Sequence, residues 1–104
     1  MDALGGLSAE IVSEAIVLWT GRGRSGWPAR DDKVLIQHYG DLGIELIPVV
    51  ERLHSVFYES DAWCTAPELG EAGNIAATRF RELYPQISEE AVEALRWCYW
   101  HDYR

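Results

Sequence analysis

The amino-acid sequence predicts an all-α fold, a compact bundle of four to five helices that forms a single domain over residues 1–104. Apolar residues recur at helical spacing along almost the whole chain, and no stretch shows the period of two that a half-buried strand requires. Loops join these helical segments, most of them short, as in a helical bundle, with one long connection over residues 59–70. Hydrophobic residues make up 48% of the 104 residues, which suffices for a core without metal or disulfide support.

The first helix is predicted between Ser8, a good N-cap residue, and Gly21, a good stop residue. Four apolar residues between them are spaced i, i+3, i+4 and i+7 and therefore share one helix face. They are Val12, Ala15, Ile16 and Trp19. We expect this face, including Trp19, to lie in the core.

Two further helices are predicted between residues 31 and 58. Asp31 or Asp32 caps a short helix that ends at Gly40, with Leu35, Ile36 and Tyr39 as its apolar positions. The following helix has an apolar face of Leu46, Val49, Val50, Leu53 and Phe57. Because proline is tolerated in a first turn, Pro48 predicts that this helix begins near residues 45–47.

A connection over residues 59–70 precedes the fourth predicted helix, which closes before Pro85. Its apolar face comprises Ala72, Ile75, Ala76, Phe80 and Leu83. Ser88 is expected to cap the last helix. One side of that helix carries Ala91, Val92, Leu95, Cys98 and Tyr99. The other side carries Glu89, Glu93, Arg96 and Trp100, with Trp97 at its edge.

The chain has 9 basic and 17 acidic side chains, a formal net charge of −8. Residues 41–104 hold twelve of the acids and only five of the bases. Such a field repels nucleic acid and anionic membranes, so we expect neither as a partner. It attracts basic proteins and accelerates their encounter.

Residues 21–26 read Gly-Arg-Gly-Arg-Ser-Gly, which matches the dinucleotide-binding pattern G-x-G-x-x-G. That pattern needs a preceding strand and a following helix, whereas here a predicted helix precedes and Trp27 with Pro28 follows. Two interpretations remain. The arginines are solvated on a flexible loop, or Arg22, Arg24 and Trp27 bind an anion or a partner.

The residues that could support metal binding or catalysis form no specific pattern. Cys98 and His101 have the C-x-x-H spacing, but Cys64 has no neighbouring ligand of its own, so we expect free thiols and no metal or cofactor. Nothing around Cys64 indicates an oxyanion hole or an oriented base. The chain is therefore expected not to be an enzyme.

Acidic and aromatic residues together indicate a protein-binding surface. Five tryptophans are many for 104 residues, and tryptophan beside charged residues is enriched in interface hot spots. The predicted partner-binding residues are Glu59, Asp61, Trp63, Glu68, Glu71, Glu93, Trp97 and Trp100. The alternative is that the rings cover the ends of the bundle and the acids are solvated.

In size, acidity and aromatic loops the chain resembles bacterial immunity proteins, which neutralise basic toxins. The resemblance implies a protein that binds a cognate basic toxin or effector domain and occludes its active site without catalysis. We expect the chain itself to be cytoplasmic and to be a monomer or weak homodimer. One alternative is a regulatory or adaptor protein that self-associates through Trp97 and Trp100. Another is a small ligand carrier or enzyme that uses a cavity in the bundle.

Overall fold

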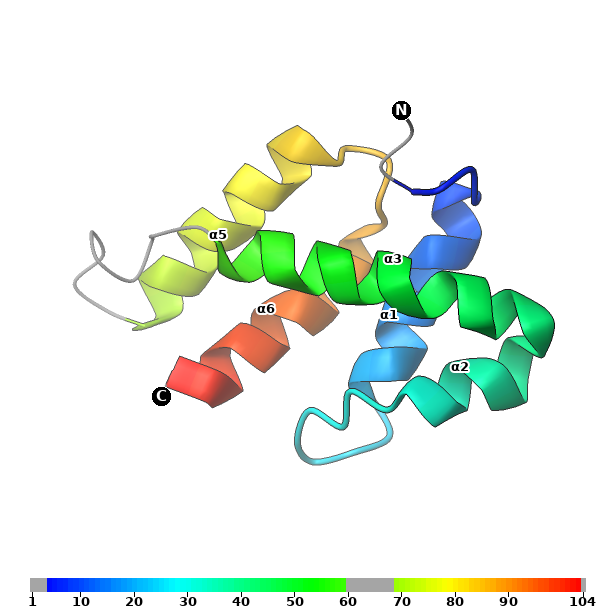
Figure 1. The fold of residues 1–104 in the computed structure, drawn as a ribbon. Coiled ribbons are helices and arrows are strands. Elements are labelled where there is room, and N and C mark those ends of the chain that lie inside the picture. Colours follow the sequence, from blue (N-terminus) through cyan, green and yellow to red (C-terminus); the bar gives the residue numbers. More distant parts are fainter. Residues whose placement is uncertain (1–3, 60–68, 104) are drawn as a thin grey trace.

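A computed structural model describes residues 4–59 and 69–103 of the chain. All regular secondary structure in these two segments is helical, as predicted. The helices are α1 (Ala9–Thr20), α2 (Asp32–Tyr39), α3 (Asp41–Tyr58), α5 (Leu69–Leu83) and α6 (Glu89–Tyr103). Figure 1 shows α3 crossing one side of the bundle, with α1 and α6 behind it.

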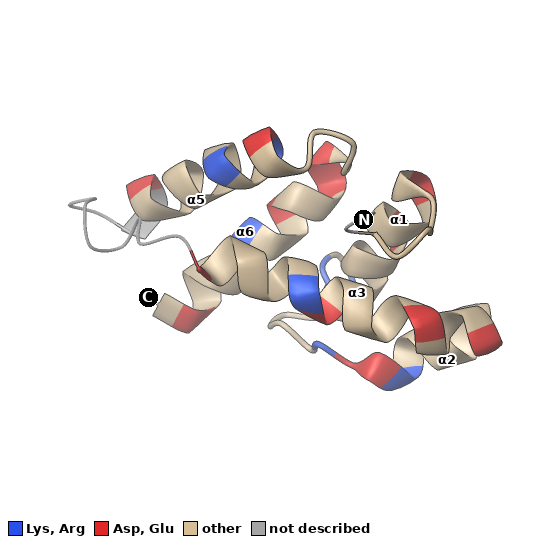
Figure 2. Ribbon diagram, turned by 45° about the horizontal axis from the view of Figure 1, so that its top comes forward, with Lys and Arg blue, Asp and Glu red and all other residues tan. Residues whose placement is uncertain are grey.

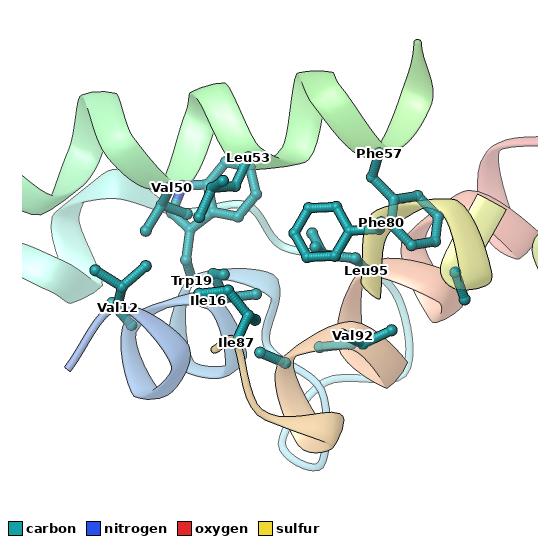
Figure 3. Close-up of a cluster of buried hydrophobic side chains, with 14 of the residues drawn as sticks. Val12, Ile16, Trp19, Val50, Leu53, Phe57, Phe80, Ile87, Val92 and Leu95 are labelled. Carbon is teal, nitrogen blue, oxygen red and sulfur yellow. The ribbon is translucent and has the colours of Figure 1, made fainter. Parts of the chain in front are cut away.

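The hydrophobic core lies where α1, α3, α5 and α6 meet (Figure 3). The ring of Phe57 on α3 contacts the rings of Phe80 and Tyr99, with centroids 5.7 and 5.8 Å apart. Trp19 is buried, as the spacing predicts, and its indole N–H donates a hydrogen bond to Asp32 Oδ1 at 2.8 Å. The polar edge of this buried ring therefore has a partner.

The predicted caps of three helices are confirmed. Ser8 Oγ accepts a hydrogen bond from the Ile11 N–H at 3.2 Å, and Asp31 accepts one from the Lys33 N–H at 3.0 Å. Ser88 Oγ accepts one from the Ala91 N–H, also at 3.2 Å. Each bond satisfies a backbone donor that a helix N-terminus leaves unpaired. The boundaries of these helices are thus encoded locally.

The start of α3 differs from the prediction. The helix begins at Asp41 rather than near residues 45–47, so Pro48 lies in its interior and not in its first turn. Proline removes the hydrogen bond that would reach the carbonyl of Ile44. Pro48 is exposed and the Ile44 side chain is 59% exposed, so water has access to this side of the helix. Solvation of the freed carbonyl makes the interior proline tolerable.

Gly43 permits the close packing of α2 against the first turn of α3. A Cβ atom at this position would collide with the carbonyl oxygen of Leu35 and lie 2.8 Å from the Cα of Ile36. Both are backbone atoms and cannot rotate away. The α2–α3 corner therefore requires glycine at this position.

Two residues assigned to apolar faces are in fact exposed, Ile36 by 44% and Leu83 by 64%. Helix α2 has only eight residues, and Leu35 is the residue that it buries fully. Leu83 is the last residue of α5. Tyr84 follows it and packs on Phe80, with ring centroids 5.2 Å apart, so at this end of α5 it is Tyr84 rather than Leu83 that contacts the core.

Candidate protein-binding face

The acidic segment predicted to bind a partner is only partly described by the structure. Asp61, Trp63 and Glu68 lie outside the described residues. Glu59 directly follows α3 and Glu71 lies in the first turn of α5, and both side chains are exposed. These two glutamates are available to a partner but lie at separate helix ends.

The predicted residue Glu93 is held by contacts within the chain. Its carboxylate lies 3.2 Å from Arg96 Nε and 3.6 Å from Arg81 Nη2. Arg81 also donates two hydrogen bonds to Glu89, at 2.5 and 2.8 Å. Glu93 therefore links α5 to α6 and fixes the direction of Arg96.

Trp97 and Trp100, the other two predicted residues on α6, line a surface pocket of about 340 Å³ together with Arg22 and Arg96. Trp100 is 41% exposed, and Trp97 is half-buried. Each indole meets the edge of the His101 ring, with centroids 5.2 Å away for Trp97 and 5.3 Å away for Trp100. The structure thus brings the two tryptophans together, but beside arginines rather than in the acidic surroundings that the sequence predicted.

The loop of residues 21–30 borders this pocket and is attached to the helices at both ends. Arg24 donates to the carbonyl oxygen of Leu18 at 3.0 Å. Arg30, in a left-handed conformation with φ of 50°, donates to Asp102 Oδ1 at 2.6 Å. Between these anchors the Trp27 side chain is 70% exposed. The loop follows helix α1 and no strand, so the structural context of a dinucleotide-binding motif is missing.

An acidic groove lies between α1 and the first turn of α6, and it is the larger hollow, with a volume of about 630 Å³. Four glutamates line it, Glu10, Glu14, Glu89 and Glu90. Val17 and Leu18 add an apolar part to its wall. Figure 2 shows the acidic first turn of α6 next to α1. Among the residues that the structure describes, no lysine or arginine lines the groove.

Sequence reasoning missed this groove because its two walls are far apart in the chain. The backbone N–H of Ser88 donates to Oγ of Ser13 at 2.9 Å, a bond between residues 75 positions apart. Ser13 is buried, so this hydroxyl is a fixed acceptor. Taken one helix at a time, Glu10, Glu89 and Glu90 are simply acidic residues in a first turn, where they are favourable to the helix dipole. Nothing in the local pattern indicates that the two starts lie side by side.

The glutamates of the groove fall into two pairs. Glu14 accepts a hydrogen bond from the Tyr39 hydroxyl at 2.5 Å, and Glu89 is bound by Arg81. Glu10 and Glu90 make no hydrogen bond or ion pair through their carboxylates with any described residue. These two exposed charges are therefore free to attract a cationic group.

A second cluster of ionisable groups joins α3 to the end of α6. Asp102 accepts hydrogen bonds from Arg30 and from the Tyr58 hydroxyl, the latter at 2.5 Å. His54 stacks on Tyr58 with centroids 4.3 Å apart, and its Nε2 has no hydrogen-bond partner among the described residues. Burial, reinforced by the charge of Arg30, lowers the pKa of His54 to about 4. The imidazole is therefore neutral near pH 7 and is held by ring packing rather than by a hydrogen bond at Nε2.

Cys98 lies in the core, as expected from its position on the helix wheel. Burial raises the pKa of its thiol to about 11, so it is protonated near neutral pH and a poor nucleophile. Among the described residues, no three His, Cys, Asp or Glu side chains are grouped so that they could hold one metal ion. Cys64, the other cysteine considered as a ligand, lies outside that part of the chain.

Comparison of the chain with models of protein families, with curated proteins and with solved structures found no match. In the described segments, no helix is both long enough and apolar enough to cross a lipid bilayer. The assignment of a function therefore depends on the geometry of the acidic groove and of the tryptophan pocket.

Proposed function

We propose that this protein is a small binding module of the immunity type, which docks a basic protein in the cytoplasm and covers that partner's active site. The partner is a toxin or effector domain with a cationic surface. The module itself carries out no reaction. Its binding face is formed by α1, α6 and the loop of residues 21–30.

The observation that carries this proposal is the acidic groove. A net charge of −8 attracts a cationic protein from a distance. The carboxylates of Glu10 and Glu90, which have no partner among the described residues, then offer a specific place for a cationic side chain to bind. The groove has room for lysine or arginine side chains, and Val17 and Leu18 can contact their aliphatic stems. A partner with a cationic surface is therefore complementary to this groove.

Exposed aromatic residues along α6 and the neighbouring loop support the same face. Trp100 and Trp27 are exposed, and both belong to segments that contact each other through the ion pair of Arg30 with Asp102. Tryptophan and arginine are the residues that most often anchor protein interfaces. Charge would thus guide the partner to the face, and ring burial would slow its release.

Affinity purification from the native host tests the proposal. The tagged chain is expected to retain one protein rich in lysine and arginine, and addition of the purified chain is expected to suppress that protein's activity. Recovery of chaperones alone with a well-folded bait would count against the proposal. A captured partner whose activity is unchanged in the complex would contradict the inhibitory role.

Replacement of Trp100 tests the aromatic anchor in the same complex. We expect Trp100→Ala to weaken binding by about 2 kcal/mol, since a buried interface indole typically contributes this much. Ile44→Ala is the control, because Ile44 is an exposed apolar residue on α3 that lines neither the acidic groove nor the tryptophan pocket. Equal affinities of the two variants would exclude Trp100 as an anchor.

A second candidate function is self-association through the same rings. Trp100, Tyr103 and Trp27 are all exposed apolar residues, and burial of such rings against a second copy would be favourable. Sedimentation equilibrium at micromolar concentration distinguishes the two. A stable dimer that Trp100→Ala dissociates would favour an adaptor, and a monomer would exclude it.

A further inference from the structure

Arg22 is a cation with no ion-pair partner among the described residues, in a chain with eight surplus negative charges. Arg30, Arg81 and Arg96 form ion pairs with carboxylates. The guanidinium of Arg22 forms no ion pair or hydrogen bond with any described residue, although it lines the pocket beside Trp97 and Trp100. Its charge is therefore available to a ligand.

The second arginine of the pocket is fixed in place but largely neutralised. Arg96 donates to Glu93 at 3.2 Å and to the side-chain oxygen of Asn74 at 3.3 Å. The surplus charge of the pocket is consequently close to that of Arg22 alone. This favours a ligand group with one negative charge over a polyanion, which the acidic chain as a whole also repels.

The remaining walls of the pocket are indole rings. Trp97 and Trp100 are braced by the ring of His101, so they present preformed apolar surfaces. Flat apolar groups pack well on such rings, and a carboxylate offers the planar geometry that a guanidinium binds with two hydrogen bonds. A pocket of about 340 Å³ has room for one aromatic acid or one residue of a peptide.

We propose that the pocket of Arg22, Arg96, Trp97 and Trp100 binds an aromatic carboxylate, with Arg22 contacting the carboxylate and the indoles contacting the ring. The same chemistry is offered by a free aromatic acid and by a protein C-terminus that ends in an aromatic residue. The inference extends the proposed function by naming the anionic group that this part of the face accepts. Its test requires no partner protein.

The test uses the indole N–H signals of the ¹⁵N-labelled full chain during titration with benzoate, with benzamide as the uncharged probe of the same shape. A peptide Gly-Gly-Phe with a free carboxylate and its C-terminal amide form the second pair. Saturable shifts of Trp97 and Trp100 are expected with both acids, with at least about ten-fold weaker binding of both amides. The signal of Trp19, which is buried and bound to Asp32, serves as the internal control.

Two arginine variants with the same loss of charge show which guanidinium binds the carboxylate. Arg22→Gln should weaken benzoate binding about ten-fold, whereas Arg52→Gln on α3, with the same loss of charge, should leave it unchanged. Tighter binding of the peptide acid than of benzoate would assign the pocket to protein termini. Benzoate binding that is equal or tighter would assign it to free aromatic acids.

Three results would overturn the inference: benzamide binding as tight as that of benzoate, inorganic phosphate binding as tight as that of benzoate, or no response of Trp97 and Trp100 to either acid. Equal effects of the two arginine variants would also overturn it. If Arg22→Gln failed to fold, the wild-type shifts would still decide the question. None of these outcomes bears on the acidic groove, so failure here is distinct from failure of the proposed function.

Discussion

The backbone N–H of Ser88 donates to the side-chain oxygen of Ser13 at 2.9 Å, and this bond sets the start of α6 against the middle of α1. Together with the packing of α1 on α6, it helps to fix the spacing of the glutamates at the two helix starts. One buried hydroxyl thus connects the packing of the bundle to the geometry of the acidic groove.

Removal of that hydroxyl should destabilise the fold measurably. Ser13→Ala leaves the Ser88 N–H without its acceptor, and we expect the free energy of unfolding to fall by about 1–2 kcal/mol. Urea denaturation followed by circular dichroism measures the change. Ser55→Ala, at an exposed position on α3, should have almost no effect. Equal destabilisation by both substitutions would show that the Ser13–Ser88 bond contributes nothing.

Two glycines inside helices should respond oppositely to alanine. Gly43→Ala places a Cβ against the backbone of Leu35 and Ile36, and the overlap should lower the free energy of unfolding by about 1–3 kcal/mol. At Gly73 in α5 the nearest atom is Arg96 Cγ at 3.4 Å, on a flexible side chain. Gly73→Ala should therefore be neutral or stabilising by up to about 1 kcal/mol. Thermal unfolding of both variants compares them, and a stabilising Gly43→Ala would refute the close approach of α2 and α3.

His54 should make stability depend on pH in the acid range. Its pKa is about 4 in the folded chain against 6.5 for a free imidazole, because of burial and the charge of Arg30, which Asp102 partly opposes. The unfolded chain therefore binds a proton that the folded chain excludes. The stabilisation is complete above pH 6.5 and is lost as the pH falls toward 4.

Comparison with His54→Phe isolates this contribution. After allowance for the partial solvent access of the imidazole, the difference in unfolding free energy between wild type and variant should shift by about 1–2 kcal/mol across that window. Chemical denaturation at several pH values measures it. The pKa of Asp102 is lowered as well, so its own loss of stabilisation occurs below its ordinary range and not in this window. A difference that stays constant with pH would contradict the account of His54.

Most of the fold was predictable because its signals are local. Ser8, Asp31 and Ser88 cap their helices through residues two or three positions away, and Trp19 follows from apolar spacing alone. The start of α3 was predicted four to six residues too late because proline is normally excluded from a helix interior, where it removes a backbone hydrogen bond. Here Pro48 is exposed to solvent, so the helix tolerates it in its interior. The close packing of α2 against α3 was not predicted, because glycine is required at residue 43 by a contact with α2 and not by the helix that contains it.

The candidate site was predictable only where it lies on one helix. The wheel of α6 identifies Trp100 as exposed, and the structure confirms it. The approach of Arg22 to that ring depends on how the loop of residues 21–30 folds back, which no periodicity encodes. The acidic groove lies where α1 packs against the start of α6, two segments far apart in the sequence, so a single helix wheel cannot show it.

The central claim is that the acidic groove binds a cationic partner, and the dissociation constant of the purified complex at low ionic strength tests it most directly. The double variant Glu10→Gln, Glu90→Gln removes the two unpaired charges of the groove without breaking an ion pair. The control is Glu45→Gln, Glu82→Gln, which changes the net charge equally at exposed positions on α3 and α5. The account predicts at least about ten-fold weaker binding for the groove variant, mainly through slower association, and less than about two-fold for the control. Equal affinities of the two double variants would contradict it.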